Sequence, residues 1–560
     1  MSRTRHLQFW PKRLAQSLPV PKTSLYDNLA VSARRYPDKV AIHYYGGSVS
    51  YRQFQDEVDS LAGFLQSKLG IVQNDRVLLF NAKFTTVNDR LLCHLTGNAV
   101  VVPMSSMNVT DELAFYINDC EATVAIAGQE LYERLAPLQK STLLQHVIVA
   151  AYSDYASPKF DLEIPDEVGA PRLDFENPQT IYWQEAISFA LKPGPLTVSE
   201  HDMAVLPYTS GTTGRPKGCV HSHGSVNANT VGASAWTSMT ANTVTLTTLP
   251  LFHVTGMQHS MNAPIFAGGT MVLLTRWNRE IAAALVERHG CTHWANIATM
   301  VVDFLANPNL INYNVKSLGF VGGGGAPLPE SVGEKLFQLL GVRYAEGYGL
   351  SETISQTHFN PPDRPKLQCL GIPSFGVDAR IIDLETLQEL GLGEQGELVV
   401  NGPQVMKEYW HRPEETEEAF ITIAEKQFFR TGDIVKYDED GYFFIVDRVK
   451  RMINASGFKV WPSEVELTMF KHRAIRQACV IGVPDTKRGE SVKVYVILHE
   501  AERGKVTEQD IIEWAKDTMS AYKYPRIVQF VDSLPTSASG KILWRQLQEE
   551  EREKYNLKVI

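Results

Sequence analysis

A glycine- and hydroxyl-rich segment, Tyr208-Thr-Ser-Gly-Thr-Thr-Gly-Arg-Pro-Lys-Gly218, has the strongest chemical signal in the sequence. Its small residues let backbone N–H groups approach a polyanion closely, its hydroxyl groups add donors, and Lys217 adds positive charge. These properties suit the phosphates of ATP. The segment is not a Walker A loop, because no Gly-Lys-Ser/Thr ends it. We therefore predict a phosphate loop of another type, in preference to a flexible linker.

Two other patterns suggest ligands that we do not expect. Gly391-Leu-Gly-Glu-Gln-Gly396 fits the Gly-x-Gly-x-x-Gly turn of dinucleotide-binding proteins, which must follow a strand and open a helix. Here it leads into the strand-like Glu397-Leu-Val-Val400, so we predict an ordinary turn. His221 and His223 have no Cys or acidic residue at metal-ligand spacing, and we interpret them as structural.

An α/β framework is predicted to position the phosphate loop, which follows the strand-like Met203-Ala-Val-Leu206. Short runs rich in β-branched and apolar residues alternate with helix-like stretches such as Ile281 to His289, a pattern typical of buried sheets flanked by helices. The clearest strand-like runs are Arg76-Val-Leu-Leu-Phe80, Ala99-Val-Val-Val-Pro103, Thr243 to Leu249 and Thr270-Met-Val-Leu-Leu274.

The pattern restarts on a smaller scale near Asp447. Ala478-Cys-Val-Ile-Gly482 and Lys493-Val-Tyr-Val-Ile-Leu498 are strand-like, and a helix is expected from about Glu508 to Met519. We predict a large N-terminal domain over residues 1–446 and a small α+β domain over residues 447–560, with Asp447-Arg-Val-Lys-Arg451 as the junction.

Length and composition restrict the class of protein. A chain of 560 residues exceeds one ordinary core, and 44% hydrophobic with 21% charged residues is typical of a soluble globular protein. The net charge of −9 argues against a nucleic-acid partner. The six cysteines show no Cys-x-x-Cys pair, as expected of reduced thiols in a cytoplasmic protein, and no apolar run is long enough to span a membrane.

The first residues are basic, with Arg3, Arg5, Lys12, Arg13 and Lys22 but no acid before Tyr26. The lack of a continuous apolar stretch argues against a secretory signal. We interpret the segment as a solvated basic leader, while an organellar transit peptide and a weak membrane-surface contact stay open.

Several motifs, in this order, resemble those of the adenylate-forming superfamily of acyl-CoA synthetases, luciferases and peptide-synthetase adenylation domains. The resemblance runs from about Thr23 to about Leu547. Besides the phosphate loop, its motifs are Leu249-Pro-Leu-Phe-His253, Gly322-Gly-Gly-Gly-Ala-Pro-Leu328, Glu346-Gly-Tyr-Gly-Leu-Ser-Glu-Thr353, Arg430-Thr-Gly-Asp433, Asp447-Arg-Val-Lys450 and Ser539-Gly-Lys541. It implies ligation of a carboxylic acid to coenzyme A through an acyl-adenylate, with ATP consumed and AMP and pyrophosphate released.

The resemblance also implies roles for individual residues. Lys541 is the mobile catalytic cation at the α-phosphate, and Glu352 is the catalytic ligand of Mg²⁺, a role compatible with helix capping. Tyr348 is expected to stack on adenine. The full set of implied ATP or AMP contacts is Thr209, Ser210, Gly211, Thr212, Thr213, Gly214, Lys217, Gly325, Ala326, Pro327, Glu346, Gly347, Tyr348, Gly349, Ser351, Asp433, Arg448 and Lys541.

The same resemblance implies where the acid and coenzyme A bind. Lys450 is the hinge about which the small domain swings, after which Ser456 and Gly457 line the coenzyme A tunnel. The implied acyl pocket has walls at Trp236, at His253, which also gates the site, and at Gly322 and Gly323.

The glycine run suggests which acid is bound. Four consecutive glycines, Gly322 to Gly325, remove side chains that would close the pocket floor, and each buried methylene is worth about 0.8 kcal/mol. We therefore expect a medium- or long-chain fatty acid. One departure is the segment 82–96, which is unusually polar for a region that resembles a buried helix. An aryl or other acid, transfer to a carrier protein, adenylation without coenzyme A, a non-catalytic relative and a homodimer stay open.

Overall fold

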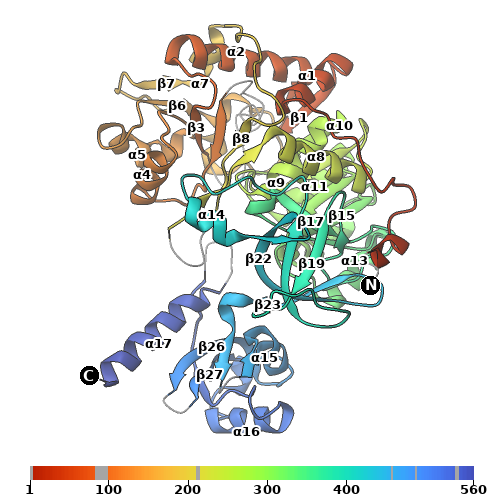
Figure 1. Ribbon diagram of the computed structural model, residues 1–560. Helices are drawn as coiled ribbons and strands as arrows, with labels where there is room; N and C mark the ends of the chain where they lie inside the picture. Colours follow the sequence, from red (N-terminus) through yellow and green to blue (C-terminus); the bar gives the residue numbers. More distant parts are fainter. Residues whose placement is uncertain are drawn as a thin grey trace. The chain divides into compact units, whose positions relative to one another are not determined.

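The chain forms two compact units (Figure 1). The computed structural model describes residues 4–81, 99–209, 215–455, 458–485, 488–536 and 542–559. The larger unit comprises Met1–Ala379, Val400–Phe429 and Glu439–Phe443, and the smaller unit comprises Arg380–Val399, Arg430–Asp438 and Phe444–Ile560. The chain passes between the units within strands β19 (Asp378–Ile382), β20 (Gly396–Asn401), β22 (Lys426–Tyr437) and β23 (Phe443–Arg448).

A nine-stranded sheet in the larger unit follows the order β18-β17-β16-β15-β14-β12-β13-β1-β2. The six strands from β16 to β1 are parallel, and β2, β17 and β18 pair in antiparallel fashion at the edges. The strands are β1 (Val40–Tyr44), β2 (Gly47–Ser50), β12 (Val244–Thr247), β13 (Thr270–Leu273), β14 (His293–Asn296), β15 (Phe320–Gly324), β16 (Ala345–Leu350), β17 (Ser355–Phe359) and β18 (Ile372–Pro373).

A seven-stranded sheet in the same unit follows the order β11-β8-β4-β3-β5-β6-β7. In β3, Val77 and Leu79 join a core shared with the first sheet, while Leu78 and Phe80 join a second core under α4 and α5. Burial on both faces explains why its inner strands β3, β4, β5 and β6 are largely apolar runs. The strands are β3 (Arg76–Phe80), β4 (Val100–Pro103), β5 (Val124–Gly128), β6 (His146–Ala150), β7 (Thr180–Tyr182), β8 (Met203–Val205) and β11 (His221–Ser222).

Helix α8 (His223–Trp236) is the most extensively buried helix next to the predicted site residues. Ser222 caps it by accepting a hydrogen bond from the Ser225 N–H at 3.1 Å. The other helices of this unit are α1 (Leu25–Arg35), α2 (Tyr51–Leu69), α4 (Thr110–Asp119), α5 (Tyr132–Leu135), α6 (Asp166–Gly169), α7 (Trp183–Ser188), α9 (Val254–Met257), α10 (Ala263–Ala267), α11 (Arg279–His289), α12 (Ala298–Leu305), α13 (Glu330–Leu340) and α14 (Pro413–Ala419).

The smaller unit is an α+β fold built on the sheet β25-β24-β27-β26, to which β28 adds next to β27. One face packs on α15 and α16, the other on α17 (Figure 1). Its elements are β24 (Ile453–Ala455), β25 (Phe458–Val460), β26 (Ile475–Asp485), β27 (Gly489–Leu498), β28 (Ile527–Phe530), α15 (Pro462–Met469), α16 (Glu508–Thr518) and α17 (Trp544–Val559).

The predicted fold class is confirmed: a large α/β part with sheets flanked by helices, and a small α+β part. The turn at Gly391–Gly396 leads into β20, as predicted. Among the described residues, no helix has the length and apolar character needed to cross a membrane. The five described cysteines are buried thiols. The predicted boundary at residue 446/447 and the mobility of the small domain stay predictions.

The prediction of a solvated N-terminal leader holds for the exposed basic residues Lys12, Arg13 and Lys22 but not for Trp10. Trp10 is only 8% exposed, and Arg13 donates hydrogen bonds to Ser238 Oγ and to the Trp236 carbonyl oxygen. The run of basic residues gave no sign that Trp10 is an aromatic anchor, and its ring partners Trp236 and Phe375 lie more than 200 residues away in the sequence.

Buried histidines in the larger unit predict a pH-dependent stability. Burial lowers the pKa of His221, His223 and His259 from 6.5 to about 4, and that of His358 to about 3. Between pH 6.5 and 4 the unfolded chain therefore binds more protons than the folded chain, so the free energy of unfolding falls as the pH falls through this window.

The fall should be measured by urea denaturation at pH 7 and pH 5, and each such histidine adds at most about 1.4 kcal/mol per pH unit. His221→Gln should flatten the pH dependence, whereas replacing the exposed His201 should not. An equal slope in His221→Gln and the unchanged protein would contradict this explanation.

Candidate active site

The carboxyl ends of four neighbouring parallel strands bring predicted site segments to one edge of the nine-stranded sheet. In the order β12-β14-β15-β16, three of these strands lead into the predicted site residues His253, Gly325 and Ser351, and β14 ends at Asn296. Ligands of open parallel sheets bind at this edge, outside the carboxyl ends of the strands. The topology therefore joins segments that lie about a hundred residues apart.

The ends of the predicted phosphate loop form a short hairpin. Strand β9 (Tyr208–Thr209) pairs with β10 (Lys217–Gly218), so that Thr209 stands opposite Lys217. The predicted phosphate contacts Ser210, Gly211, Thr212, Thr213 and Gly214 lie outside the described residues, as do Ser456, Gly457, Lys541 and the segment 82–96.

Tyr409 joins the hairpin to the predicted metal ligand. The Lys217 ammonium lies 4.3 Å from the centroid of the Tyr409 ring, and the Tyr409 hydroxyl donates to Glu352 Oε1 at 2.9 Å. Burial raises the pKa of Tyr409, and the Glu352 carboxylate raises it further, so the hydroxyl stays a donor. Lys217, Tyr409 and Glu352 together form a phosphate-side cluster with one cation and one carboxylate.

Backbone pairing fixes Tyr409 in this place. The Met406 N–H donates to the Glu352 carbonyl oxygen at 2.7 Å, and the Trp410 N–H donates to the Gly218 carbonyl oxygen at 2.8 Å. The segment 406–410 therefore runs between the hairpin and Glu352, which places the Tyr409 ring between the Lys217 and Glu352 side chains.

Asp119 anchors the hairpin from its other side. Its carboxylate accepts hydrogen bonds from the Tyr208 hydroxyl at 2.7 Å and from Arg412 at 2.5 Å. Its carbonyl oxygen also accepts from Trp410 Nε1 at 3.0 Å. One residue at the end of α4 thus fixes the start of the hairpin and the segment that carries Tyr409.

His221 holds the turn that follows β16. Its Nε2 lies 2.7 Å from the Ser351 carbonyl oxygen and must donate to it, because a carbonyl only accepts. Asn229 on α8 donates to the carbonyl oxygens of Thr353 and Gln356 at 3.3 and 3.2 Å. These bonds place the turn that presents Glu352, and they give His221 the structural role that its sequence context suggested.

Glu346, a predicted ATP or AMP contact, also has a structural role, and its contact with the nucleotide stays a prediction. It is 5% exposed, and its carboxylate accepts hydrogen bonds from the Leu328 and Cys369 N–H groups at 2.9 and 3.0 Å. We therefore assign it to holding the neighbouring loop, in which Gly325, Ala326 and Pro327 are exposed. Their contacts with a nucleotide, and those of Gly347, Gly349 and Ser351, stay predictions.

Tyr348, which is expected to stack on adenine, is a partly exposed aromatic residue of the motif Glu346–Thr353, here called the predicted adenine segment. It lies at the end of β16, with its ring 5.9 Å from that of His358. Its stacking on adenine stays a prediction.

Strand packing gives the glycine run another explanation. A Cβ atom at Gly322 would lie 2.5 Å from the Ala345 carbonyl oxygen, and one at Gly323 would lie 1.8 Å from the Asn296 carbonyl oxygen. No side chain fits at either position without moving a neighbouring strand. The glycines are therefore required by the sheet, and a deep acyl tunnel does not follow from them.

The two other predicted acyl-pocket residues differ in exposure. Trp236, at the end of α8, is 1% exposed and donates from Nε1 to the Asn360 carbonyl oxygen at 2.9 Å. His253 is exposed at the start of α9, with its ring 4.7 Å from that of Phe252. Their contacts with the acid stay predictions.

In the smaller unit, Asp433 and Arg448 form an ion pair. Arg448 Nε lies 2.9 Å from Asp433 Oδ1, and the side chains are 46% and 1% exposed, respectively. Glu397 holds the preceding turn by accepting hydrogen bonds from Arg430 and from the Gly432 N–H. The structure thus brings together two of the predicted ATP or AMP contacts.

The predicted hinge lies between two anchored neighbours. Lys450 is exposed in the 3₁₀ turn Val449–Arg451. Asp447 accepts a hydrogen bond from the Ser463 N–H at 2.6 Å, and Arg451 pairs with Glu466 at 2.6 Å, both on α15. Rotation about Lys450 stays a prediction.

The donor set fits Mg²⁺ carried by a nucleotide. No group of three or more His, Cys, Asp or Glu side chains able to hold a metal occurs within the described part of the chain. Glu352 offers one carboxylate close to the Lys217 cation. Mg²⁺ takes one or two carboxylates together with phosphate oxygens and water, so a single carboxylate at a phosphate site suffices.

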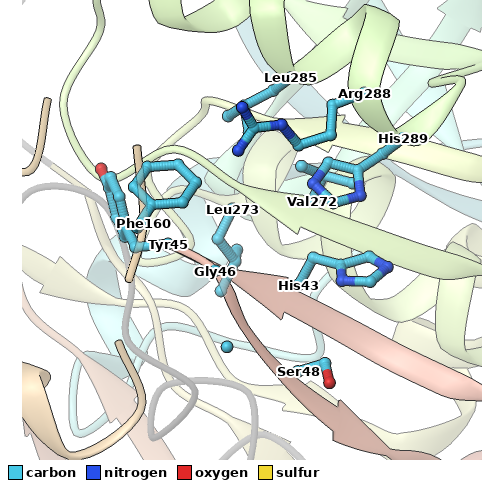
Figure 2. A pocket seen from close by; sticks show the side chains of 11 residues that line it. His43, Tyr45, Gly46, Ser48, Phe160, Val272, Leu273, Leu285, Arg288 and His289 are labelled. Carbon is cyan, nitrogen blue, oxygen red and sulfur yellow. The ribbon is translucent and has the colours of Figure 1, made fainter. Parts of the chain in front are cut away.

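Figure 2 shows a cavity elsewhere in the larger unit, with a volume of about 280 Å³. Its lining includes His43, Arg288 and His289 and none of the predicted site residues. Both oxygens of Asp161 accept from the Arg288 guanidinium, and burial lowers the pKa of His43 and of His289. The cavity thus presents neutral imidazoles and a paired cation, which is a poor setting for a polyphosphate.

Sequence reasoning missed Tyr409, Asp119 and the hydrogen bond of His221. None of them lies in a motif, and each acts on residues far along the chain. Only the aromatic character of the segment Tyr409-Trp-His411 could have drawn attention to it.

Comparisons with known proteins show the family. The model of the AMP-binding enzyme family matches residues 29–410, and that of the AMP-binding enzyme C-terminal domain matches residues 464–541. A long-chain-fatty-acid–CoA ligase of Bacillus subtilis (strain 168) is 33% identical over 560 residues, covering 98% of each chain. A feruloyl-CoA synthase of Amycolatopsis sp is 30% identical over 517 residues, covering 91% of this chain and 96% of the relative. The ATP-bound structure of MatB from Rhodopseudomonas palustris, 25% identical, superposes with a TM-score of 0.80, covering 96% of this chain and all of that one (100%).

Proposed function

Because the chain belongs to the family of AMP-binding enzymes, we propose that it joins a medium- or long-chain fatty acid to coenzyme A through an acyl-adenylate. The grouping of Lys217, Tyr409 and Glu352 beside the carboxyl ends of the parallel strands is the observation that supports this proposal most strongly. It sets a cation and the predicted Mg²⁺ ligand next to the predicted phosphate loop.

In the first step, a carboxylate oxygen of the acid attacks the α-phosphorus of ATP. The new O–P bond forms as the bond to the bridging oxygen breaks, and pyrophosphate leaves with the negative charge. Lys217 and Lys541 offset the charge that repels one anion from another. Glu352 would hold Mg²⁺, which supplies further neutralisation of the phosphates when bound.

In the second step, the sulfur of coenzyme A attacks the acyl carbon of the adenylate. The bond from that carbon to the phosphate oxygen breaks, AMP leaves, and the thiol proton passes to solvent. In this proposal Ser456 and Gly457 line the path of the thiol, and Lys450 is the residue about which the smaller unit turns between the two steps.

The proposed acid class is supported by a relative rather than by the glycine run. The Bacillus subtilis ligase named for long-chain fatty acids is 33% identical over nearly the whole chain. An aryl acid is the second candidate, and the feruloyl-CoA synthase at 30% identity favours it. Fatty and aryl acids differ in shape, so the order of turnover rates across a panel of acids distinguishes the two candidate substrate classes.

The test uses straight-chain acids from butanoate to octadecanoate together with ferulate, each with Mg-ATP, with and without coenzyme A. Mass spectrometry measures the thioester, and an enzymatic assay measures pyrophosphate. We expect AMP, pyrophosphate and thioester in equal amounts, and a gain in kcat/KM of up to about fourfold for each methylene that is buried.

Three outcomes would contradict the proposal. Faster turnover of ferulate than of any straight-chain acid would favour the aryl candidate. Pyrophosphate without consumption of coenzyme A would indicate adenylation alone or transfer to a carrier protein. No turnover of any acid would favour a non-catalytic relative.

A further inference from the structure

The segment of residues 4–24, here called the N-terminal strap, inserts an aromatic side chain into the larger unit. The Trp10 ring packs against those of Trp236 and Phe375, with centroids 5.0 Å from each and interplanar angles of 85° and 84°, and the latter two rings also contact each other. Such edge-to-face pairs are favourable and have a defined geometry. Trp10 is 8% exposed, so the contact is a packed one.

Arg13 of the strap forms hydrogen bonds with the end of α8 and the residues that follow it. Its Nε donates to Ser238 Oγ at 2.7 Å, and a second nitrogen donates to the Trp236 carbonyl oxygen at 2.9 Å. Its remaining terminal nitrogen pairs with Asp363 at 3.1 Å. The planar guanidinium therefore holds the backbone of Trp236, while the Trp10 ring packs against the Trp236 side chain.

Trp236 in turn holds the predicted adenine segment through Asn360. Trp236 Nε1 donates to the Asn360 carbonyl oxygen at 2.9 Å. The backbone N–H and Nδ2 of Asn360 both donate to the Glu346 carbonyl oxygen, at 2.9 and 3.0 Å. Asn360 is fully buried, so water does not readily replace these bonds.

A second route runs through Phe359, whose ring lies 6.1 Å from that of Trp236. Phe359 stands opposite Gly347 in the antiparallel pair of β17 and β16. A Cβ atom on Gly347 would lie 2.7 Å from the Phe359 ring, so the ring packs directly against the Gly347 backbone. A shift of Trp236 therefore moves Gly347 as well as Glu346.

We propose that the N-terminal strap positions the nucleotide site: Trp10 and Arg13 set Trp236, and Trp236 sets the segment Glu346–Tyr348 through Asn360 and Phe359. The inference rests on the proposed function, in which this segment contacts the adenine. Trp10 and Arg13 are positioning residues, because they act through Trp236. Loss of either should weaken ATP binding while leaving the rate at saturating ATP nearly unchanged.

The test measures the Kd of ATP by titration calorimetry, and KM for ATP and kcat in steady state. Arg13→Ala should raise both ATP constants about fivefold, the size of one lost hydrogen bond, and Trp10→Ala about tenfold. In both variants kcat should stay within about twofold. Trp10→Phe keeps an aromatic ring and should restore most of the affinity.

Arg5→Ala is the matched control, because Arg5 lies on the same strap but donates to the Glu439 carbonyl oxygen at 3.4 Å, away from Trp236. It should leave ATP binding unchanged. Thermal unfolding of every variant gives the temperature range in which each is folded. If Trp10→Ala does not fold, Arg13→Ala alone tests the proposal.

Wild-type affinity for ATP in Arg13→Ala, or equal weakening by Arg5→Ala, would overturn the proposal even if the melting temperatures fall. Absence of ATP binding by the unchanged protein would instead overturn the proposed function. Calorimetry with ATP alone separates these failures, because it needs no acid substrate.

Discussion

Lys541→Ala is expected to lose on the order of 100- to 1000-fold in the rate of adenylation, while a supplied acyl-adenylate still reacts with coenzyme A at close to the normal rate. The reason is that only the first step brings a carboxylate against a polyphosphate. A cation at the α-phosphate stabilises that transition state and has no corresponding charge to offset during attack by the thiol.

The two half-reactions are measured separately, the first by acid-dependent exchange of labelled pyrophosphate into ATP and the second by thioester formation from a synthetic adenylate. Lys516→Ala, at an exposed position on α16, is the matched control and should change neither rate. Equal loss of both half-reactions in Lys541→Ala would count against the assigned role.

Glu352→Gln is expected to slow adenylation by about 100-fold and to raise the Mg²⁺ concentration needed for half-maximal rate. The amide keeps the shape of the side chain and can still accept from the Tyr409 hydroxyl, which lies 2.9 Å from Glu352 Oε1. The change therefore removes charge rather than packing, and thermal stability should be little altered.

Tyr409→Phe distinguishes the effect of the Glu352 charge from the effect of holding the Glu352 side chain in place. This variant keeps the ring under the Lys217 ammonium but removes the donor to Glu352, and it should slow adenylation by about tenfold, with less effect on the Mg²⁺ requirement. Glu334→Gln, an exposed change on α13, should have no effect. An unaltered Mg²⁺ requirement in Glu352→Gln would show that the metal is held elsewhere.

Local elements were predictable because their sequence patterns reflect local packing. The run Arg76–Phe80 is a strand over the predicted residues, since both of its faces are buried and all of its core positions are apolar. Helix α11 begins at Arg279, two residues before the expected Ile281, because the Asn278 side chain caps it.

The site was only partly predictable, because its supporting contacts are long-range. Glu346 is in a predicted binding motif, yet its carboxylate is bonded to backbone N–H groups that no local pattern reveals. Gly323 suggested an open pocket, whereas the neighbouring strand fills the space of a side chain there. Trp10 finds its partner Trp236 only in the folded chain.

The acid itself was not determined by the residues. The distinction between fatty and aryl acids depends on the volume of a pocket that no motif specifies, and relatives named for either class are about equally similar. The order of rates across the acid panel is therefore the informative observation for substrate class.

The most direct test of the account is a crystal structure with a non-hydrolysable ATP analogue and Mg²⁺. We predict the triphosphate against the hairpin that joins Thr209 to Lys217, with the metal ion on Glu352. A triphosphate bound away from this hairpin, for example in the cavity lined by His43 and Arg288, would contradict the account.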